Sequence, residues 1–409
     1  MQKRWQHYAL LVALLIHGGA WLYLARFSLW SDEASSVWFA RQSVRDLFVT
    51  LCDPHPPLYY IFLHFWLKLG DGEVWLRLPS LLASLATLGV LYRWMGAWFG
   101  RKQAQWIVIL LALQPVQIWY AAEVRMYAIV QFLTILAAYL AWHSWQNETF
   151  KWSDAGLYWL AATAALWVDY TAVFGLGMVQ LLWLAYKFPQ SKRWILLQLA
   201  VGLPTALAWV FSGQLVALGS SYQPLFLAQR LAQLGLTVSL EQAALLLKMG
   251  AVVIGVVGVL VALRWQKIVT WRKIHLIAVL LLLIWLILVF ASAYPRLFTL
   301  KRLLLVLLPW GTLIIVWVIV QLSEMVQRYT IAFLVMTVLL LLGVNQKVGW
   351  RSAVQQALLT EDTTAIWVDE LVVPAFQYYA TPSQRGQIIW LDRLPDLPEL
   401  AVQQSSLLV

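Results

Sequence analysis

Residues 8–27 read YALLVALLIHGGAWLYLARF, an apolar run that follows the basic residues Lys3 and Arg4. A membrane-spanning helix needs about 20 predominantly apolar residues, so this run predicts a first transmembrane helix. A basic stretch before an apolar one is also typical of a signal peptide, but no small-residue cleavage site follows here. We therefore expect the helix to be retained, with the N-terminus in the cytoplasm.

The composition of the whole chain indicates an integral membrane protein with many spans. Of 409 residues, 62% are hydrophobic and 12% are charged, whereas soluble domains have about 25% charged residues. The net charge of +10 comes largely from Lys and Arg in short clusters between apolar runs, which is a topology signal rather than a nucleic-acid surface. Cys52 is the single cysteine, which excludes an intrachain disulfide.

Further apolar runs predict an all-α polytopic bundle of about eleven transmembrane helices. The predicted spans cover residues 8–27, 77–97, 104–122, 127–145, 154–168, 171–187, 194–212, 242–263, 275–293, 303–322 and 329–345. With the N-terminus inside, the short inner loops carry dense positive charge, as the positive-inside rule requires. The C-terminus is then extracytoplasmic.

Two segments outside the spans shape the predicted organisation. The apolar stretch Leu58–Leu69 is too short to span, so we expect a juxtamembrane helix within a long first outer loop, residues 28–76. Counting it as a span would move the later basic clusters to the outside. Residues 346–409 are polar enough for a small soluble α/β tail beyond a transmembrane domain of residues 1–345, with strands near 364–368 and 387–391 and a helix between them.

Ionisable side chains at the outer ends of the spans are the candidate functional residues, because such groups near a membrane are costly and usually functional. They come from five separate places in the chain, yet the predicted topology puts them at one level of the membrane. They are Asp32, Glu33, Asp53, His55, Glu123, Arg125, Asp169, Arg296, Lys301 and Arg302.

Each acidic candidate has a structural and a functional interpretation. Asp32 and Glu33 suit the first turn of a helix with Ser31 as N-cap, and a carboxylate held there can also act as a general base. Asp53 and His55 stand in a proline-rich turn, which either only fixes the backbone or preorganises a site. Two ligands are too few for a mononuclear metal site, so a divalent metal stays open.

The basic candidates likewise have two interpretations. Arg125 either extends to the interface or holds an anionic headgroup. Arg296, Lys301 and Arg302 form either a lipid anchor or a specific phosphate site. The chain has no phosphate-binding glycine motif of a nucleotide enzyme, and no internal repeat that would support an inverted-repeat transporter.

Four motifs in order resemble the bacterial relatives of protein O-mannosyltransferases, glycosyltransferase family 39 of the GT-C superfamily. The matching segments are Trp30–Ala34, Asp53–Tyr60, Glu73–Ser80 and Glu123–Ala128, within a resemblance over roughly residues 20–180, and a weaker similarity covers 295–312. The resemblance implies a GT-C-like helical bundle that takes a sugar, by implication a hexose, from a polyprenyl-phosphate donor.

The resemblance also implies roles for individual residues. Asp32 matches the catalytic acidic position, and Glu33 is its neighbour. Arg125, with Arg302, Lys301 and Arg296, is implied at the donor phosphate. The implied substrate-binding residues are Asp53, His55, Glu123, Tyr127, Asp169 and Tyr170. Asp169-Tyr170 stands where many relatives have His-Tyr, and the large lumenal domain of the eukaryotic enzymes is absent.

The sequence thus predicts an inverting glycosyltransferase in the plasma (inner) membrane, with Asp32 as general base on the extracytoplasmic side. Its partners are the bilayer, a polyprenyl-phosphate-linked sugar and an acceptor glycan, lipid or protein, without nucleic acid. The alternatives are a transporter or flippase for a lipid-linked sugar, and a non-catalytic relative that binds one. The sugar, the acceptor and the oligomeric state stay open.

Overall fold

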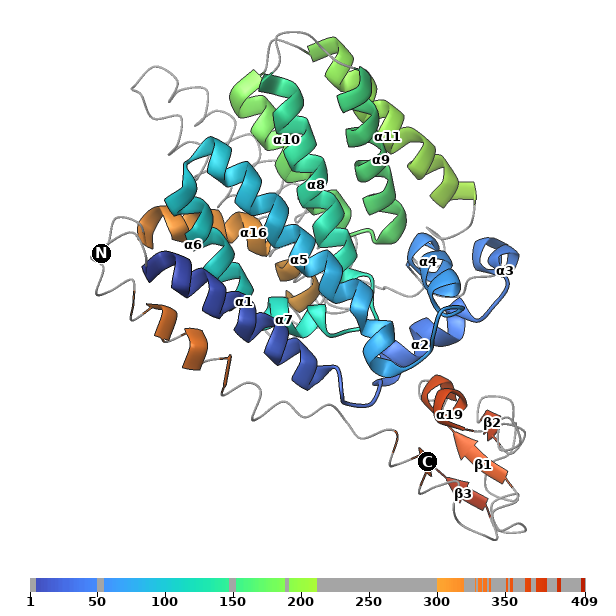
Figure 1. The fold of residues 1–409 in the computed structure, drawn as a ribbon. Helices are drawn as coiled ribbons and strands as arrows, with labels where there is room; N and C mark the ends of the chain where they lie inside the picture. Colours follow the sequence, from blue (N-terminus) through green and yellow to red (C-terminus); the bar gives the residue numbers. More distant parts are fainter. Residues whose placement is uncertain are drawn as a thin grey trace, which may run out of the picture.

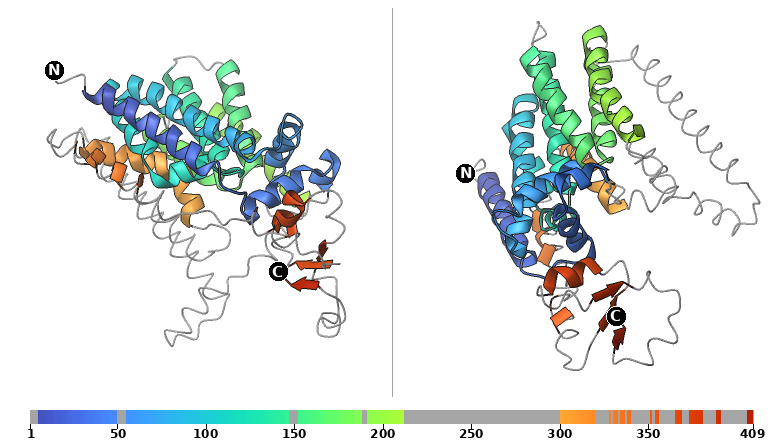
Figure 2. Two further views of the ribbon diagram at one scale, coloured as in Figure 1. Left: turned by 60° about the horizontal axis from the view of Figure 1, so that its bottom comes forward. Right: turned by 90° about the vertical axis from the view of Figure 1, so that its right-hand side faces the viewer.

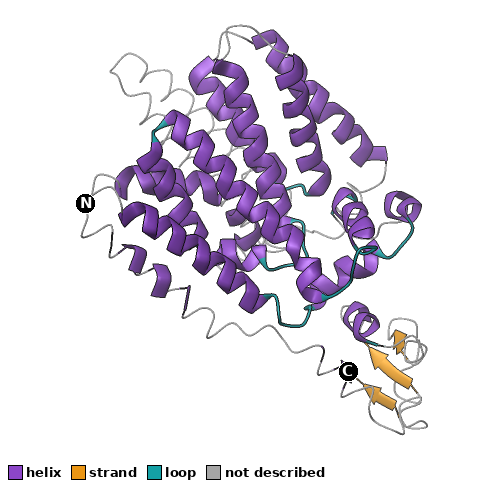
Figure 3. Ribbon diagram, in the orientation of Figure 1, coloured by secondary structure: helices purple, strands orange, loops and turns teal. Residues whose placement is uncertain are grey.

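The computed structural model describes residues 5–49, 55–146, 152–187, 191–211 and 300–319, together with shorter pieces between 328 and 408. The described part is a bundle of helices with a small sheet near the C-terminus (Figures 1 and 3). The helices are α1 Trp5–Leu24, α2 Ser31–Ala40, α3 Val44–Val49, α4 Leu58–Trp66, α5 Glu73–Trp98, α6 Arg101–Ala112, α7 Pro115–Ala121, α8 Tyr127–Gln146, α9 Trp152–Val168, α10 Ala172–Lys187, α11 Ser191–Phe211, α16 Leu300–Ile319 and α19 Val373–Tyr379.

The helices of the bundle pack in a simple order. Helix α8 packs against α5, α9 and α10, and α6 packs between α1 and α16 (Figure 1). Helices α2 and α4 contact each other at one end of the bundle, where α4 also reaches α9. At nine residues α4 is too short to cross a bilayer, and it lies where a juxtamembrane helix was predicted.

Within the described residues, three helices are long and apolar enough to cross a membrane: α1, α5 and α8. The pair α6 and α7 adds a fourth if the two count as one bent span. Helices also occupy the predicted spans at 154–168, 171–187, 194–212 and 303–322. The spans at 242–263 and 275–293, and most of 329–345, lie outside the described residues, so the total of eleven stays a prediction.

The third predicted span, 104–122, is not a single straight helix. It breaks into α6 and α7, which meet at an angle of 67°. Pro115 causes the break, because its ring excludes the helical conformation at Gln114, whose ψ is 125°. At the end of α6 the carbonyl of Ala112 lies 2.9 Å from His17 Nδ1 in α1, so a side chain of another helix satisfies it.

Prolines inside other helices are compensated in the same way. Pro79, Pro204 and Pro309 lie within α5, α11 and α16, and each leaves the carbonyl four residues earlier without its usual donor. A side-chain N–H from another helix replaces that donor each time: Trp66 Nε1 donates to Trp75 O at 3.1 Å, Trp159 Nε1 to Ala200 O at 3.0 Å, and Gln131 Nε2 to Leu305 O at 2.7 Å.

The tail forms a parallel sheet. Strands β1 Ala365–Val368, β2 Ile388–Trp390 and β3 Ser406–Leu408 pair in the order β2-β1-β3, with Ile366 opposite Ile388. Helix α19 connects β1 and β2, which reproduces the predicted βαβ fragment. Strand β3 was not predicted from the sequence. Helix α19 packs against α2, so the tail contacts the segment between α1 and α5 (Figure 2).

The compensation of Pro309 generates a prediction. Gln131→Leu leaves the carbonyl of Leu305 without a donor and also breaks two hydrogen bonds with Gln117, so we expect a loss of at least about 1–2 kcal/mol of stability, seen as a lower melting temperature in nanodiscs. In a Pro309→Ala background, residue 309 regains a backbone N–H for Leu305. The same Gln131 substitution should then lower the melting temperature less, because only the contacts with Gln117 are lost, and equal losses in both backgrounds would contradict this account.

Candidate active site

A wholly buried ion pair lies where α2 meets α5. Glu33 and Arg77 are both 0% exposed, and they form a two-pronged contact: Arg77 Nε to Glu33 Oε1 at 2.8 Å and Nη2 to Oε2 at 2.6 Å. The remaining guanidinium hydrogens go to backbone carbonyls, of Ala25 at 2.9 Å, Phe27 at 2.7 Å and Ser28 at 3.1 Å. Every N–H donor of Arg77 therefore has an acceptor, as a buried guanidinium requires.

The carboxylate of Glu33 reaches beyond Arg77 to two backbone N–H groups. Trp30 N donates to it at 3.1 Å, and Val124 N, in the loop after α7, donates at 2.9 Å. The predicted N-cap Ser31 is wrong: the cap position belongs to Trp30, whose N–H is satisfied by the third residue of the helix. We call residues 25–30 the α1–α2 linker. Hydrogen bonds from its backbone to the buried side chains of Glu33 and Arg77 thus fix this segment.

Arg125 joins this framework to Asp32. Its Nη1 donates to the backbone carbonyl of Asp32 at 3.2 Å and to Ser36 Oγ at 3.0 Å, and its guanidinium lies 5.7 Å from the ring centre of Tyr127. Arg125 is only 4% exposed, so the interpretation in which it extends to the membrane surface is wrong. Asp32, in the first turn of α2, is partly exposed beside it.

His55 and Asp169 form a second polar pair next to Tyr127. His55 Nδ1 lies 3.0 Å from Asp169 Oδ2, and the His55 ring meets the Tyr127 ring edge-on at 6.5 Å between centres. Asp169 Oδ1 accepts the backbone N–H of Thr171 at 2.7 Å and also its hydroxyl. Burial raises the pKa of Asp169, but the contacts with His55 and Thr171 outweigh it and hold the pKa below its usual value.

Two further side chains complete the cluster. Tyr59, in α4, is buried and interacts electrostatically with Arg125 and Glu123, and burial raises the pKa of its hydroxyl. Glu123 is buried in the loop before α8, where its backbone carbonyl accepts the hydroxyl of Ser80 at 2.5 Å.

The structure therefore brings Asp32, Arg125 and Tyr127 together. The ring of His55, which pairs with Asp169, contacts the ring of Tyr127. Tyr170 follows in the chain and is partly exposed. Asp53 and Arg296 lie outside the described residues, while Lys301 and Arg302 are in the first turn of α16, where only the backbone is described. Their roles, like those of the other predicted site residues, stay predictions.

Arg77, Ser36 and Tyr59 were not singled out as candidates. Arg77 and Tyr59 do lie in the quoted motifs, which was the available signal, but a lone Arg at the start of a span is usually an interfacial anchor. Among the described residues, no three His, Cys, Asp or Glu side chains are grouped closely enough to hold a metal ion.

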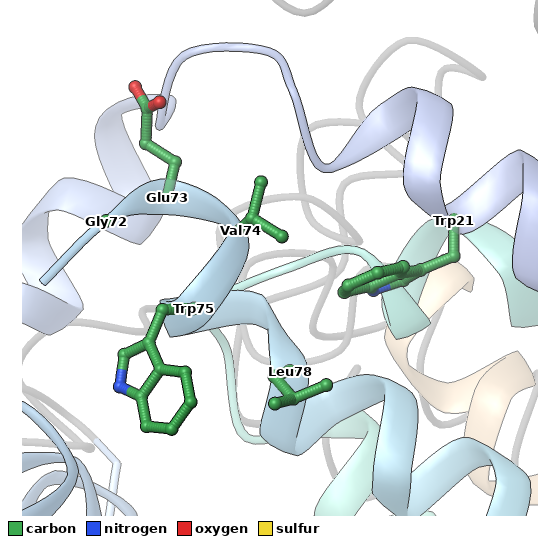
Figure 4. Close-up of a pocket in the computed structure, with 6 residues that line it drawn as sticks. All are labelled: Trp21, Gly72, Glu73, Val74, Trp75 and Leu78. Carbon is green, nitrogen blue, oxygen red and sulfur yellow. The ribbon is translucent and has the colours of Figure 1, made fainter. Parts of the chain in front are cut away.

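A separate hollow of about 430 Å³ lies at the junction of α1 and α5 (Figure 4). Its lining is mostly apolar, with Trp21, Val74 and Leu78 among the walls and Glu73 as the charged residue. Because it shares no residue with the Asp32 cluster and offers few polar groups, we place the sugar chemistry in the cluster instead.

A solved structure shares this architecture. ArnT from Cupriavidus metallidurans bound to undecaprenyl phosphate aligns over 95% of this chain and 86% of its own, with a TM-score of 0.59 and 12% identity. ArnT is a GT-C glycosyltransferase. The chain therefore shares the fold of ArnT.

A second structure, of ArnT from the same organism in the apo state, aligns over 88% of this chain and 64% of its own, with a TM-score of 0.48 and 16% identity. Neither protein-family models nor curated proteins give a match. The similarity in fold to the first of these structures supports the GT-C-like bundle that the motifs implied, whereas membership of family 39 stays a prediction.

The pair of Asp169 and His55 generates a prediction about stability. The folded-state pKa of Asp169 is lowered, so its carboxylate stabilises the fold above the unfolded-state pKa of about 4, and this contribution is lost as the pH falls through the lower folded value. Asp169→Asn should therefore lower the melting temperature near neutral pH. The difference from wild type should shrink below pH of about 4; a difference independent of pH would contradict the assignment.

Proposed function

We propose that this protein is a membrane glycosyltransferase that moves a sugar from a polyprenyl-phosphate donor to an acceptor hydroxyl. The observation that carries the proposal is the junction of Asp32 and Arg125, two residues far apart in the chain, at one end of the bundle. Arg125 holds the backbone carbonyl of Asp32, and an aspartate next to a buried guanidinium suits a reaction in which one reactant loses a proton and the other leaves as a phosphate.

In the proposed mechanism, Asp32 takes the proton of the acceptor hydroxyl as the oxygen attacks the anomeric carbon. The bond between that carbon and the donor phosphate breaks, and the lipid phosphate departs with the electron pair. A phosphate is already a good leaving group, so the step needs no general acid. Arg125 would offset the growing negative charge in a partly dry site, with Lys301 and Arg302 as further proposed cations.

One base and no nucleophile predict inversion at the anomeric carbon, by analogy with the two-carboxylate logic of glycosidases. We propose that Glu33 has a positioning role rather than a share in proton transfer. Its carboxylate is wholly buried and accepts four hydrogen bonds, one each from Trp30 and Val124 and the paired contacts of Arg77. It orients the turn that presents its neighbour Asp32.

The His55–Asp169 pair and Tyr127 are proposed to line the donor site. The contact with Asp169 orients the His55 ring, and an imidazole held in this way can meet a sugar hydroxyl or a phosphate oxygen. The edge of the His55 ring on Tyr127 connects this pair to Arg125. The undecaprenyl phosphate bound to the ArnT structure supports a polyprenyl phosphate as the carrier class here.

The test offers purified protein in nanodiscs a panel of polyprenyl-phosphate sugars with candidate acceptors. Released polyprenyl phosphate is measured by mass spectrometry for wild type and Asp32→Asn. We expect release from wild type and a loss of at least about 100-fold in the variant, because a general base contributes about 10²–10⁴-fold. Binding of the donor should persist in Asp32→Asn, since the substitution keeps the size of the side chain.

Arg125→Ala is the comparison variant: it keeps the Asp32 carboxylate but removes the proposed phosphate contact, together with the hydrogen bond to the backbone carbonyl of Asp32. It should raise the apparent KM for the donor. Near-normal turnover in Asp32→Asn would refute the base assignment. Donor binding without release in wild type would instead favour the transporter or the non-catalytic binding interpretation.

A further inference from the structure

The α1–α2 linker is held from a second side by the C-terminal tail. Tyr379, the last residue of α19, accepts the backbone N–H of Leu29 at 2.6 Å and donates its hydroxyl to Glu73 Oε1 at 2.8 Å. The backbone N–H of Arg351 donates to Ser28 Oγ at 3.2 Å. The linker therefore has contacts with α5 on one side and with the tail on the other.

Tyr379 is suited to join the tail to the linker. Its single hydroxyl serves two partners at once, one as acceptor and one as donor, which only the protonated form can do. Burial raises the pKa of the Tyr379 hydroxyl, and the contact with Glu73 raises it further, so it stays protonated at physiological pH. Glu73 in turn is the first residue of α5, one turn before Arg77, and it also pairs with Arg351.

The linker leads directly into the turn that carries the proposed base. Leu29 is followed by Trp30, the cap position of α2, and Asp32 lies in the first turn of that helix. Helix α19 also packs against α2, so the tail contacts both the linker and the helix that follows it (Figures 1 and 2). A shift of the linker would therefore turn the start of α2 and move the carboxylate of Asp32.

We propose that Tyr379 is a positioning residue for the transferase reaction: from the extracytoplasmic tail it fixes the α1–α2 linker, and through the linker it sets the direction of the Asp32 carboxylate. This inference rests on the proposed function. It gives the tail a task in the reaction, although the tail contributes no group to the Asp32 cluster among the described residues. Misplacement of a catalytic group by about 1 Å can reduce the rate by about 100-fold.

The neighbouring Tyr378 supplies a matched control. It lies on the same helix, and its hydroxyl donates to the backbone carbonyl of Asp71 at 2.6 Å rather than to the linker. The guanidinium of Arg41 lies 5.5 Å from its ring centre, a contact that a phenylalanine ring retains. Tyr378→Phe and Tyr379→Phe thus remove the same chemical group one residue apart, with only the second reaching Leu29.

The experiment compares full-length wild type, Tyr379→Phe and Tyr378→Phe in nanodiscs. Turnover is measured with the donor that wild type uses, and hydrogen exchange is followed in peptides covering residues 25–36. For Tyr379→Phe we expect kcat to fall about tenfold with the donor KM changed less than about twofold, and exchange in these peptides to become faster. Tyr378→Phe should match wild type in both measurements.

Wild-type kcat and exchange in Tyr379→Phe would overturn the proposal. Equal losses in both variants would also overturn it, because they would indicate that general docking of the tail matters rather than the linker contact. If wild type itself releases no carrier from any donor, the proposed function fails. The exchange data then decide alone: unchanged exchange in Tyr379→Phe rejects the linker contact, and faster exchange confined to that variant supports it.

Discussion

The buried ion pair of Glu33 and Arg77 is the interaction on which the rest of the site depends. Two charges removed from water are stable only when their hydrogen-bonding capacity is used, and here the partners are backbone groups from separate segments. The pair therefore connects the α1–α2 linker, the start of α2, the start of α5 and the loop after α7. Asp32 and Arg125 lie next to Glu33 and Val124, two of the groups so fixed, which explains how residues from distant segments meet.

A related constraint governs the bundle itself. Backbone groups within a bilayer need protein partners, so a proline inside a span is tolerated only when a neighbour supplies a donor. Trp66, Trp159 and Gln131 supply such donors, and His17 does the same at the break between α6 and α7. These contacts fix the packing between helices at the points where the helices themselves are weakest. The loop that carries Arg125 follows α7, so the bend between α6 and α7 also affects where Arg125 lies.

The sequence predicted those parts of the site that depend on local residue type. The acidic first turn at Asp32 and a short helix within Leu58–Leu69 follow from charge and length, and both agree with the structure, whereas the position of that helix outside the membrane stays a prediction. Ser31 is not the N-cap because α2 begins one residue earlier than predicted: the cap position is Trp30, whose N–H donates to Glu33, and Glu33 is itself held by a distant partner, Arg77. Partners of that kind leave no periodic signal in a single chain.

The pairing of His55 with Asp169 illustrates the same limit. Each residue was a candidate alone, but their contact depends on how α4 packs against α9, which the hydrophobic pattern does not specify. Tyr379 is a stronger case, because a tyrosine at the end of a short helix in a polar tail has no feature that links it to Leu29. Its significance emerges only when the tail is folded back on the first outer loop.

The central claim is that the donor phosphate binds at Arg125 with its sugar beside Asp32. A cryo-EM structure of the Asp32→Asn variant in nanodiscs with a bound polyprenyl-phosphate sugar tests it most directly. The account predicts density for the phosphate within hydrogen-bonding distance of the Arg125 guanidinium, and the anomeric carbon facing the side chain at position 32. Phosphate density elsewhere, such as in the apolar hollow between Trp21 and Leu78, would contradict the account.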